Sequence, residues 1–187
     1  KSKYLKKTIV TTNDIKILKL AKKFNKIIPY KRSPKLSKST SLMSDAILDV
    51  LNNKKEIFFD NYYFVLLQPT SPQRKSTDID NAITKFLKIK KKFDVLVTVS
   101  EPFNHPRELL HKSKNKFKFT LKRNNELNRQ KYFKSYFVNG SIVISSVESY
   151  KKVKSFYLKN TYYMETPKKF SIDLNDEIEK KIIEKLI

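Results

Sequence analysis

Leu66-Leu67-Gln68-Pro69-Thr70-Ser71-Pro72 is the stretch of this sequence that decides the fold. It completes the apolar run 62–67, which has no polar alternation and is typical of a central strand covered on both faces. The run ends in a polar loop that two prolines hold. Open α/β sheets bind ligands at the carboxyl ends of their strands. We therefore expect a ligand site at this loop, and the later segment Ser171-Ile172-Asp173-Leu174-Asn175-Asp176 offers a carboxylate that can hold a cation.

Strand and helix patterns alternate on both sides of this loop. Residues 62–67, 78–87 and 95–99 predict strand, helix and strand, which implies a right-handed crossover between parallel strands. The sequence also predicts strands at 8–10, 27–30, 141–144 and 162–164, and helices at 15–21, 42–51, 146–150 and 176–186. We expect one α/β domain over residues 1–187, a three-layer sandwich with a mainly parallel sheet. Residues 101–140 are an irregular excursion in which 117–119 can form half of a hairpin.

The composition limits the possible partners and compartments. A formal charge of +23 suits a nucleic-acid-binding module, but the lysines are spread along almost every segment instead of one arm, so we expect no nucleic acid. The charge still favours attraction of anions. The chain has no cysteine, which excludes disulfides and thiolate chemistry and is compatible with the cytoplasm. No apolar run reaches the roughly 18 residues that span a bilayer, so we expect a soluble protein without a membrane partner.

The loop segment resembles a known family. Residues 66–80 are similar to the L-L-Q-P-T-S-P-x-R-x-x-x-D-I-D segment of the acylneuraminate cytidylyltransferases, also called CMP-sialic acid synthetases. Residues 10–14 resemble V-S-T-D-D of that family, and 29–34 resemble P-F-x-R-P. Residues 128–130 with 139–140 resemble N-R-Q followed by N-G, and 171–175 resemble S-I-D-I-D. The segments occur in the family's order over essentially the whole chain, which makes the set far more specific than any one of them.

The resemblance implies a nucleotide-diphospho-sugar transferase-like fold and a cytidylyltransferase. Such an enzyme transfers a cytidylyl group from CTP to a nine-carbon 2-keto sugar acid of the nonulosonic type, and it releases pyrophosphate with the help of Mg²⁺. The resemblance also implies that residues 101–140 form a protruding dimerisation segment, and hence a homodimer. Positioning and stabilisation of phosphoryl charge are the chemical demands on such a site.

The resemblance assigns roles to individual residues. Asp173 is the expected catalytic and metal-binding carboxylate, and Asn175 stands where the family has a second metal-binding aspartate. The other assignments are substrate contacts at Gln68, Ser71, Arg129 and Asn139 and nucleotide contacts at Arg32 and Thr40.

Four of these residues have a structural alternative. Asp173 can instead be the N-terminal carboxylate of the helix at 176–186, and Ser71 can be a turn residue. Arg32 can be one more solvated cation, and Thr40 can be a helix cap.

Two departures from the family bear on the expected activity. Asn175 removes one negative charge from the metal pair, which also suits a non-catalytic homologue. The chain has a single glycine, Gly140, and nothing resembles the family's basic, glycine-containing phosphate loop. We therefore expect a family member that lacks the first strand and phosphate loop, with impaired activity.

Overall fold

The computed structural model of the chain describes residues 2–58, 63–122 and 128–186. Two compact units are formed, and β4, β7 and β8 each run from one unit into the other. The first unit comprises Lys1–Leu66, Lys75–Leu96 and Val143–Tyr162, and the second comprises Leu67–Arg74, Val97–Ile142 and Tyr163–Ile187.

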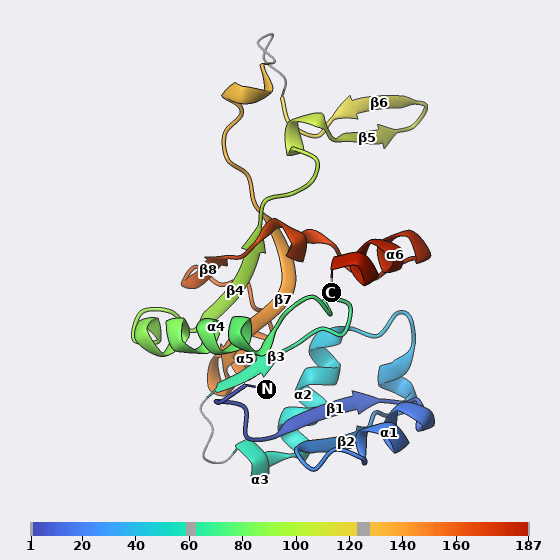
Figure 1. The fold of residues 1–187 in the computed structure, drawn as a ribbon, viewed down its shortest axis with the longest axis vertical. Coiled ribbons are helices and arrows are strands. Elements are labelled where there is room, and N and C mark those ends of the chain that lie inside the picture. Colours follow the sequence, from blue (N-terminus) through green and yellow to red (C-terminus); the bar gives the residue numbers. More distant parts are fainter. Residues whose placement is uncertain (1, 59–62, 123–127, 187) are drawn as a thin grey trace. The chain divides into compact units, whose positions relative to one another are not determined.

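The first unit begins with a strand, helix and strand, as predicted (Figure 1). β1 (Thr8–Thr12) and β2 (Ile27–Lys31) pair in parallel, and α1 (Ile15–Ala21) connects them. Asp14 caps α1, because its Oδ1 accepts hydrogen bonds from the backbone N–H groups of residues 16 and 17 at 2.6 and 3.2 Å. The helix predicted at 15–21 is therefore confirmed, with Asp14 as its N-cap.

The next helix begins later in the sequence than a cap at Thr40 would require. After a 3-10 turn, η1 (Pro34–Ser37), helix α2 spans Met43–Asn53 and is followed by α3 (Lys55–Phe58). Leu42 is the N-cap of α2, so the prediction of Thr40 as a cap is wrong. The reason is local: Ser41 Oγ donates to the Lys35 carbonyl and accepts from the Lys38 N–H, which keeps this segment out of helical geometry.

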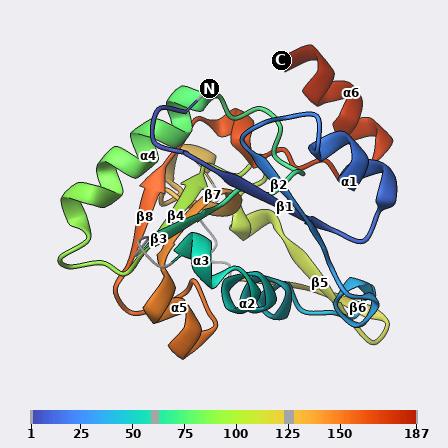
Figure 2. The same ribbon diagram turned by 90° about the horizontal axis from the view of Figure 1, so that it is seen from below.

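Helices cover both faces of β3 (Tyr63–Leu66) in the first unit. The Tyr63 ring makes an edge contact with Phe86 of α4 (Ser76–Ile89) at a centroid distance of 5.0 Å. The next residue, Phe64, makes an edge contact with Tyr150 of α5 (Val147–Val153) at 5.4 Å. Neighbouring strand residues point to opposite faces, so these contacts define helix, sheet and helix layers, and Figure 2 shows α4 and α5 on opposite sides of β3.

The main sheet has four strands in the order β3, β7, β4, β8, with β7 at Phe137–Ser146, β4 at Val95–Ser100 and β8 at Thr161–Glu165. β3 pairs with β7 in antiparallel orientation, so β7 lies between the two strands of the predicted crossover. The α/β sandwich is confirmed, with mixed pairing. The prediction that 62–67 form a central strand is wrong for the described strands, because β3 has one neighbour. Its uninterrupted apolar pattern reflects the helices that cover both of its faces. The pattern does not indicate the position of the strand within the sheet.

The second unit contains the excursion and the C-terminal helix. β5 (Leu110–Ser113) and β6 (Lys116–Phe119) form an antiparallel hairpin beyond the carboxyl end of β4 (Figure 1), which confirms the expected hairpin. Short 3-10 turns occur at η2 (Pro106–Glu108), η3 (Arg129–Lys131) and η4 (Lys168–Ser171). The predicted C-terminal helix is α6 (Glu177–Leu186). Within the described ranges, no helix has the length and apolar character needed to cross a membrane.

Candidate functional site

The loop 67–74 and the segment 171–175, which are a hundred residues apart in sequence, lie against each other in the second unit. The Leu174 N–H donates to the Thr70 carbonyl at 2.8 Å. The Gln73 side chain donates from Nε2 to the Ile172 carbonyl at 2.6 Å. Main-chain and side-chain bonds of this kind fix one segment relative to the other, so the two motifs that the sequence singled out form one site.

Ser71 and Asp173 make direct contact at this site. The buried Ser71 hydroxyl donates to Asp173 Oδ1 at 3.0 Å. This bond orients the carboxylate, and the remaining lone pairs of a carboxylate can accept further donors or a cation. Ser71 is therefore more than a turn residue, because its side chain holds the acidic group in place.

Arg74 completes the charge balance around Asp173. Its guanidinium Nη1 donates to the Ser71 carbonyl at 2.7 Å and interacts electrostatically with the Asp173 carboxylate. Burial lowers the pKa of Arg74 from its usual value, and the Asp173 carboxylate opposes that shift. An arginine remains protonated at any physiological pH. The site thus has a fixed cation beside its carboxylate, at the arginine position of the loop motif.

Asp176, not Asp173, is the acidic residue that caps α6. Asp176 Oδ1 accepts from the Glu179 N–H at 2.8 Å, which is the hydrogen bond of an N-terminal cap. The exposed Asn175 donates its backbone N–H to Glu179 Oε2 at 2.8 Å. The helix-capping alternative for Asp173 is therefore wrong, since that position is already occupied and the Asp173 side chain bonds to Ser71.

The donors near Asp173 suit a hard cation that is shared with a substrate. Nowhere in residues 2–58, 63–122 and 128–186 do three or more His, Cys, Asp or Glu side chains gather to hold a metal ion. Mg²⁺ commonly takes one or two carboxylates, with phosphate and water oxygens as its other ligands. One carboxylate at Asp173 and an amide oxygen at Asn175 fit that mode of binding, but they do not fit an all-protein cage.

Asn139 lies within a polar cluster of the second unit. Its side chain is 3% exposed, and its amide bonds to Thr98, Ser100, Ser141 and Thr166, all within the protein. The next residue, Gly140, has a φ of +61° and lies directly against the Gln68 side chain. The structure therefore brings the predicted residues Asn139 and Gln68 into one neighbourhood, with Gly140 between them.

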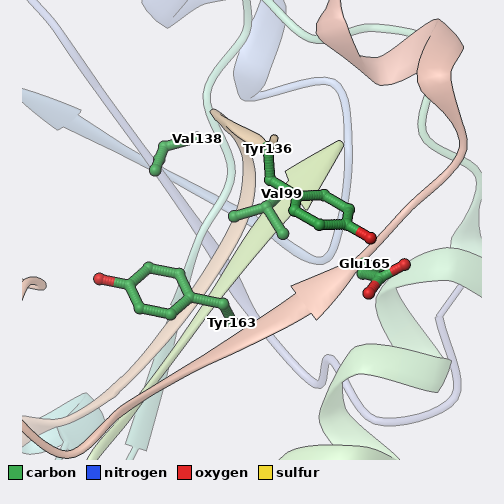
Figure 3. Close-up of a pocket in the computed structure, with 5 residues that line it drawn as sticks. All are labelled: Val99, Tyr136, Val138, Tyr163 and Glu165. Carbon is green, nitrogen blue, oxygen red and sulfur yellow. The ribbon is translucent and has the colours of Figure 1, made fainter. Parts of the chain in front are cut away.

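A cavity of about 450 Å³ lies on the sheet in the second unit (Figure 3). Its lining residues come from β4, β7 with the residue before it, and β8: Val99, Tyr136, Val138, Tyr163 and Glu165. A hydrogen bond to Glu165, together with burial and the nearby Glu165 and Glu101 charges, raises the pKa of Tyr136. Sequence reasoning assigned no role to these residues. The spacing of two residues between Tyr136 and Val138, and between Tyr163 and Glu165, could have indicated a shared sheet face.

The predicted nucleotide-binding residues belong to the first unit. Arg32 follows β2, its backbone N–H donates to the Thr12 carbonyl at 3.0 Å, and its Nε is buried without a hydrogen-bond partner. Arg32 is therefore not simply a solvated cation. Thr40 is exposed in the turn before α2. The backbone of Arg129 lies in η3, whereas its side chain is outside the described part of the structure.

The architecture has a counterpart among solved structures. Over its whole length the chain is similar to a solved structure, CMP:2-keto-3-deoxy-manno-octonic acid synthetase complexed with CTP, with a TM-score of 0.59, 11% identity and 81% of that chain covered. The chain thus has the α/β fold of a nucleotide-sugar-forming transferase.

The sequence comparisons identify the family. Residues 1–186 match the profile of the family described as Cytidylyltransferase. The chain is also 33% identical over 145 residues to N-acylneuraminate cytidylyltransferase of Streptococcus agalactiae serotype V, which covers 77% of this chain and 34% of that protein. Post-translational flagellin modification protein B of Campylobacter coli is 28% identical over 189 residues, covering 100% of this chain and 79% of that protein. The chain belongs to the cytidylyltransferase family of nucleotidyltransferases, and it spans about a third of the length of the streptococcal relatives it matches.

Proposed function

We propose that this protein forms a CMP-activated nonulosonic acid from CTP and a nine-carbon 2-keto sugar acid. The observation that carries the proposal is the contact between Ser71 and Asp173, which joins the two segments that most resemble the acylneuraminate cytidylyltransferases. The name of the streptococcal relatives supports the same reaction class. The net charge of +23 favours approach of both anionic substrates.

In the proposed reaction, the anomeric hydroxyl oxygen of the sugar acid attacks the α-phosphorus of CTP. A new P–O bond forms, the bond between the α-phosphorus and the bridging oxygen of the β-phosphate breaks, and pyrophosphate leaves. The hydroxyl proton passes to a nearby base or to water. Arg74 holds the Ser71 carbonyl, Ser71 orients Asp173, and the Gln68 amide can both donate to and accept from sugar oxygens.

Mg²⁺ is part of the proposal. When bound, it would neutralise phosphate charge on the nucleotide. Asp173, with help from the Asn175 amide, would hold it together with the phosphates. This arrangement needs only one carboxylate from the protein, and the described site provides one at Asp173.

The direct test is formation of the CMP-sugar acid. The protein is incubated with CTP, Mg²⁺ and each of several nonulosonic acids, and pyrophosphate release and the mass of the product are measured. We expect product with at least one sugar acid, loss of product when EDTA replaces Mg²⁺, and no product with ATP. The 187 residues alone should work slowly, since one glycine provides no glycine-rich phosphate loop. If no sugar acid tested yields a CMP-sugar acid with CTP and Mg²⁺, the proposal is wrong.

We also propose that the excursion 101–140 mediates a homodimer. The β5–β6 hairpin exposes apolar side chains, with Leu110 51% exposed and Phe117 68% exposed. Exposed apolar side chains in one segment are typical of an interaction surface. The occupant we propose is the same hairpin region of a second copy.

Phe117→Asp should convert a dimer to a monomer in light scattering coupled to size-exclusion chromatography. The neighbouring Lys118 points to the other face of β6, so Lys118→Asp is the matched control and should leave the dimer intact. A wild-type protein that is monomeric at tens of micromolar, or equal dissociation by both variants, would contradict the dimer proposal.

A further inference from the structure

We infer that Thr98, Asn139 and Gly140 act together as positioning residues for the Gln68 side chain, and that they thereby set the selectivity of the site for the sugar acid. The inference rests on the proposed function, because it assumes that Gln68 contacts that substrate. Its structural part concerns only residues of the second unit.

The first step is that the Asn139 amide is fully used inside the protein. Its Oδ1 accepts from the Thr98 hydroxyl at 2.7 Å and from the Ser141 N–H at 3.0 Å. Its Nδ2 donates to the Ser100 hydroxyl at 3.0 Å and to the Thr166 hydroxyl at 2.9 Å. An amide side chain has two donor hydrogens and two acceptor lone pairs, so no capacity remains for a ligand. Asn139 can influence a substrate only through what it positions.

The second step is that Thr98 connects this amide to the strand backbone. The Thr98 hydroxyl lies 2.7 Å from Asn139 Oδ1 and 3.1 Å from the Ile142 carbonyl, which are the two acceptors for its one hydrogen, and its oxygen accepts the Ile142 N–H at 3.0 Å. β7 therefore bonds to the side chain of Thr98 just where Gly140 adopts a left-handed backbone conformation. A glycine in the left-handed conformation and a strand N–H that bonds to a side chain are features of a local irregularity. Such an irregularity changes the direction of the strand.

The third step is the contact between the irregular backbone and Gln68. A Cβ atom on Gly140 would lie 2.9 Å from Gln68 Oε1 and 3.4 Å from Gln68 Cδ. These distances leave no room for a methyl group unless the Gln68 amide moves. The backbone at Gly140 thus contacts the end of the Gln68 side chain and limits where its amide can lie, and the polar cluster holds that backbone in place.

The chemistry of selectivity follows from this geometry. A site that hydrogen-bonds a substrate hydroxyl or amide discriminates strongly against analogues that lack the group, provided that the site's own donor or acceptor is held in position. Thr98 and Asn139 support the backbone at Gly140, and that backbone contacts Gln68. We therefore expect changes at these residues to alter recognition of the sugar acid and to spare recognition of CTP.

The test uses two variants in the cluster and one matched control. Thr98→Val keeps the shape of the side chain and removes the hydroxyl, whereas Gly140→Ala places a methyl group against Gln68 and also strains the left-handed backbone at that position. Thr161 is the control, because it is also buried and its hydroxyl both donates and accepts, to the Phe156 carbonyl at 2.9 Å and from the Leu158 N–H at 2.8 Å. Thr161→Val should cause a comparable loss of stability without a change at Gln68.

We expect the KM for the sugar acid to rise about 10- to 100-fold in Thr98→Val and Gly140→Ala, the scale of a misplaced contact group, with the KM for CTP within about twofold of wild type. Thr98→Ser, which restores the hydroxyl, should recover most of the affinity. In NMR spectra the side-chain amide signals of Gln68 should shift in Thr98→Val and Gly140→Ala and stay in place in Thr161→Val.

The two readouts separate this inference from the proposed function. A wild-type protein that makes no CMP-sugar acid would sink the proposed function, while the Gln68 amide signals would still test the positioning. Unmoved Gln68 signals in both Thr98→Val and Gly140→Ala would overturn the inference. Equal increases of both KM values would also overturn it, because a general distortion of the site produces that result.

Discussion

Asp173→Asn is expected to lower the rate of CMP-sugar acid formation by about 10²- to 10³-fold, the scale seen when one electrostatic contact to a reacting group is removed. The substitution keeps the shape of the side chain and its acceptor oxygen for Ser71, so the loss is one of charge. A neutral amide also leaves Arg74 without its anionic neighbour. Pyrophosphate release at saturating CTP and sugar acid measures the effect.

The matched control is Asp176→Asn, three residues further along. That carboxylate caps α6 and is exposed, so its replacement should change activity by less than about threefold and cost at most about 1 kcal/mol of stability. Similar losses of activity in Asp173→Asn and Asp176→Asn would show that Asp173 has no special role in the reaction. An Asp173→Asn protein of wild-type activity would rule out its assignment as the metal-binding carboxylate.

Phe86→Ala should lower the free energy of unfolding by about 3–5 kcal/mol, the usual cost of truncating a buried phenylalanine. Phe86 of α4 is 1% exposed and its ring contacts Tyr63 of β3, so the substitution opens a cavity between a helix and the sheet that it covers. Urea unfolding followed by circular dichroism measures the loss.

Leu87 is the control for this effect, because it is the next residue of the same helix and is 42% exposed. Leu87→Ala should cost less than about 1 kcal/mol, as is usual for substitutions at the surface. If the two variants lost the same stability, the assignment of α4 as a covering layer over β3 would be wrong.

Much of the fold could be predicted from the sequence, because the relevant interactions are local. Helix α1 begins after Asp14, whose carboxylate accepts hydrogen bonds from the backbone N–H groups two and three residues later in the chain. A cap of this kind can be recognised in a short window of sequence. The α/β class follows from alternating helix and strand periodicities. Thr40 failed as a cap since the bonds of Ser41 to residues 35 and 38 compete with the helix, and no propensity rule ranks these two outcomes.

The place of each strand in the sheet could not be predicted in this way. The apolar run at β3 and the buried residues of β4 report coverage of both faces, which is a property of each strand alone. The position of β7 between β3 and β4 depends on its pairing with β3, which lies about eighty residues away in the sequence. Pairing of distant strands is decided by tertiary packing, which periodicity does not record.

By itself, the sequence singled out the two segments on which the proposed function rests: the loop with Gln68 and Ser71, and the acidic segment with Asp173. Only the tertiary structure decided how they act. It placed the Ser71 hydroxyl on Asp173, gave the helix cap to Asp176, and enclosed Asn139 among four partners so that it supports the backbone beside Gln68. The physical reason is that residue type fixes what a group can donate or accept, whereas its actual partners depend on which distant groups are buried next to it.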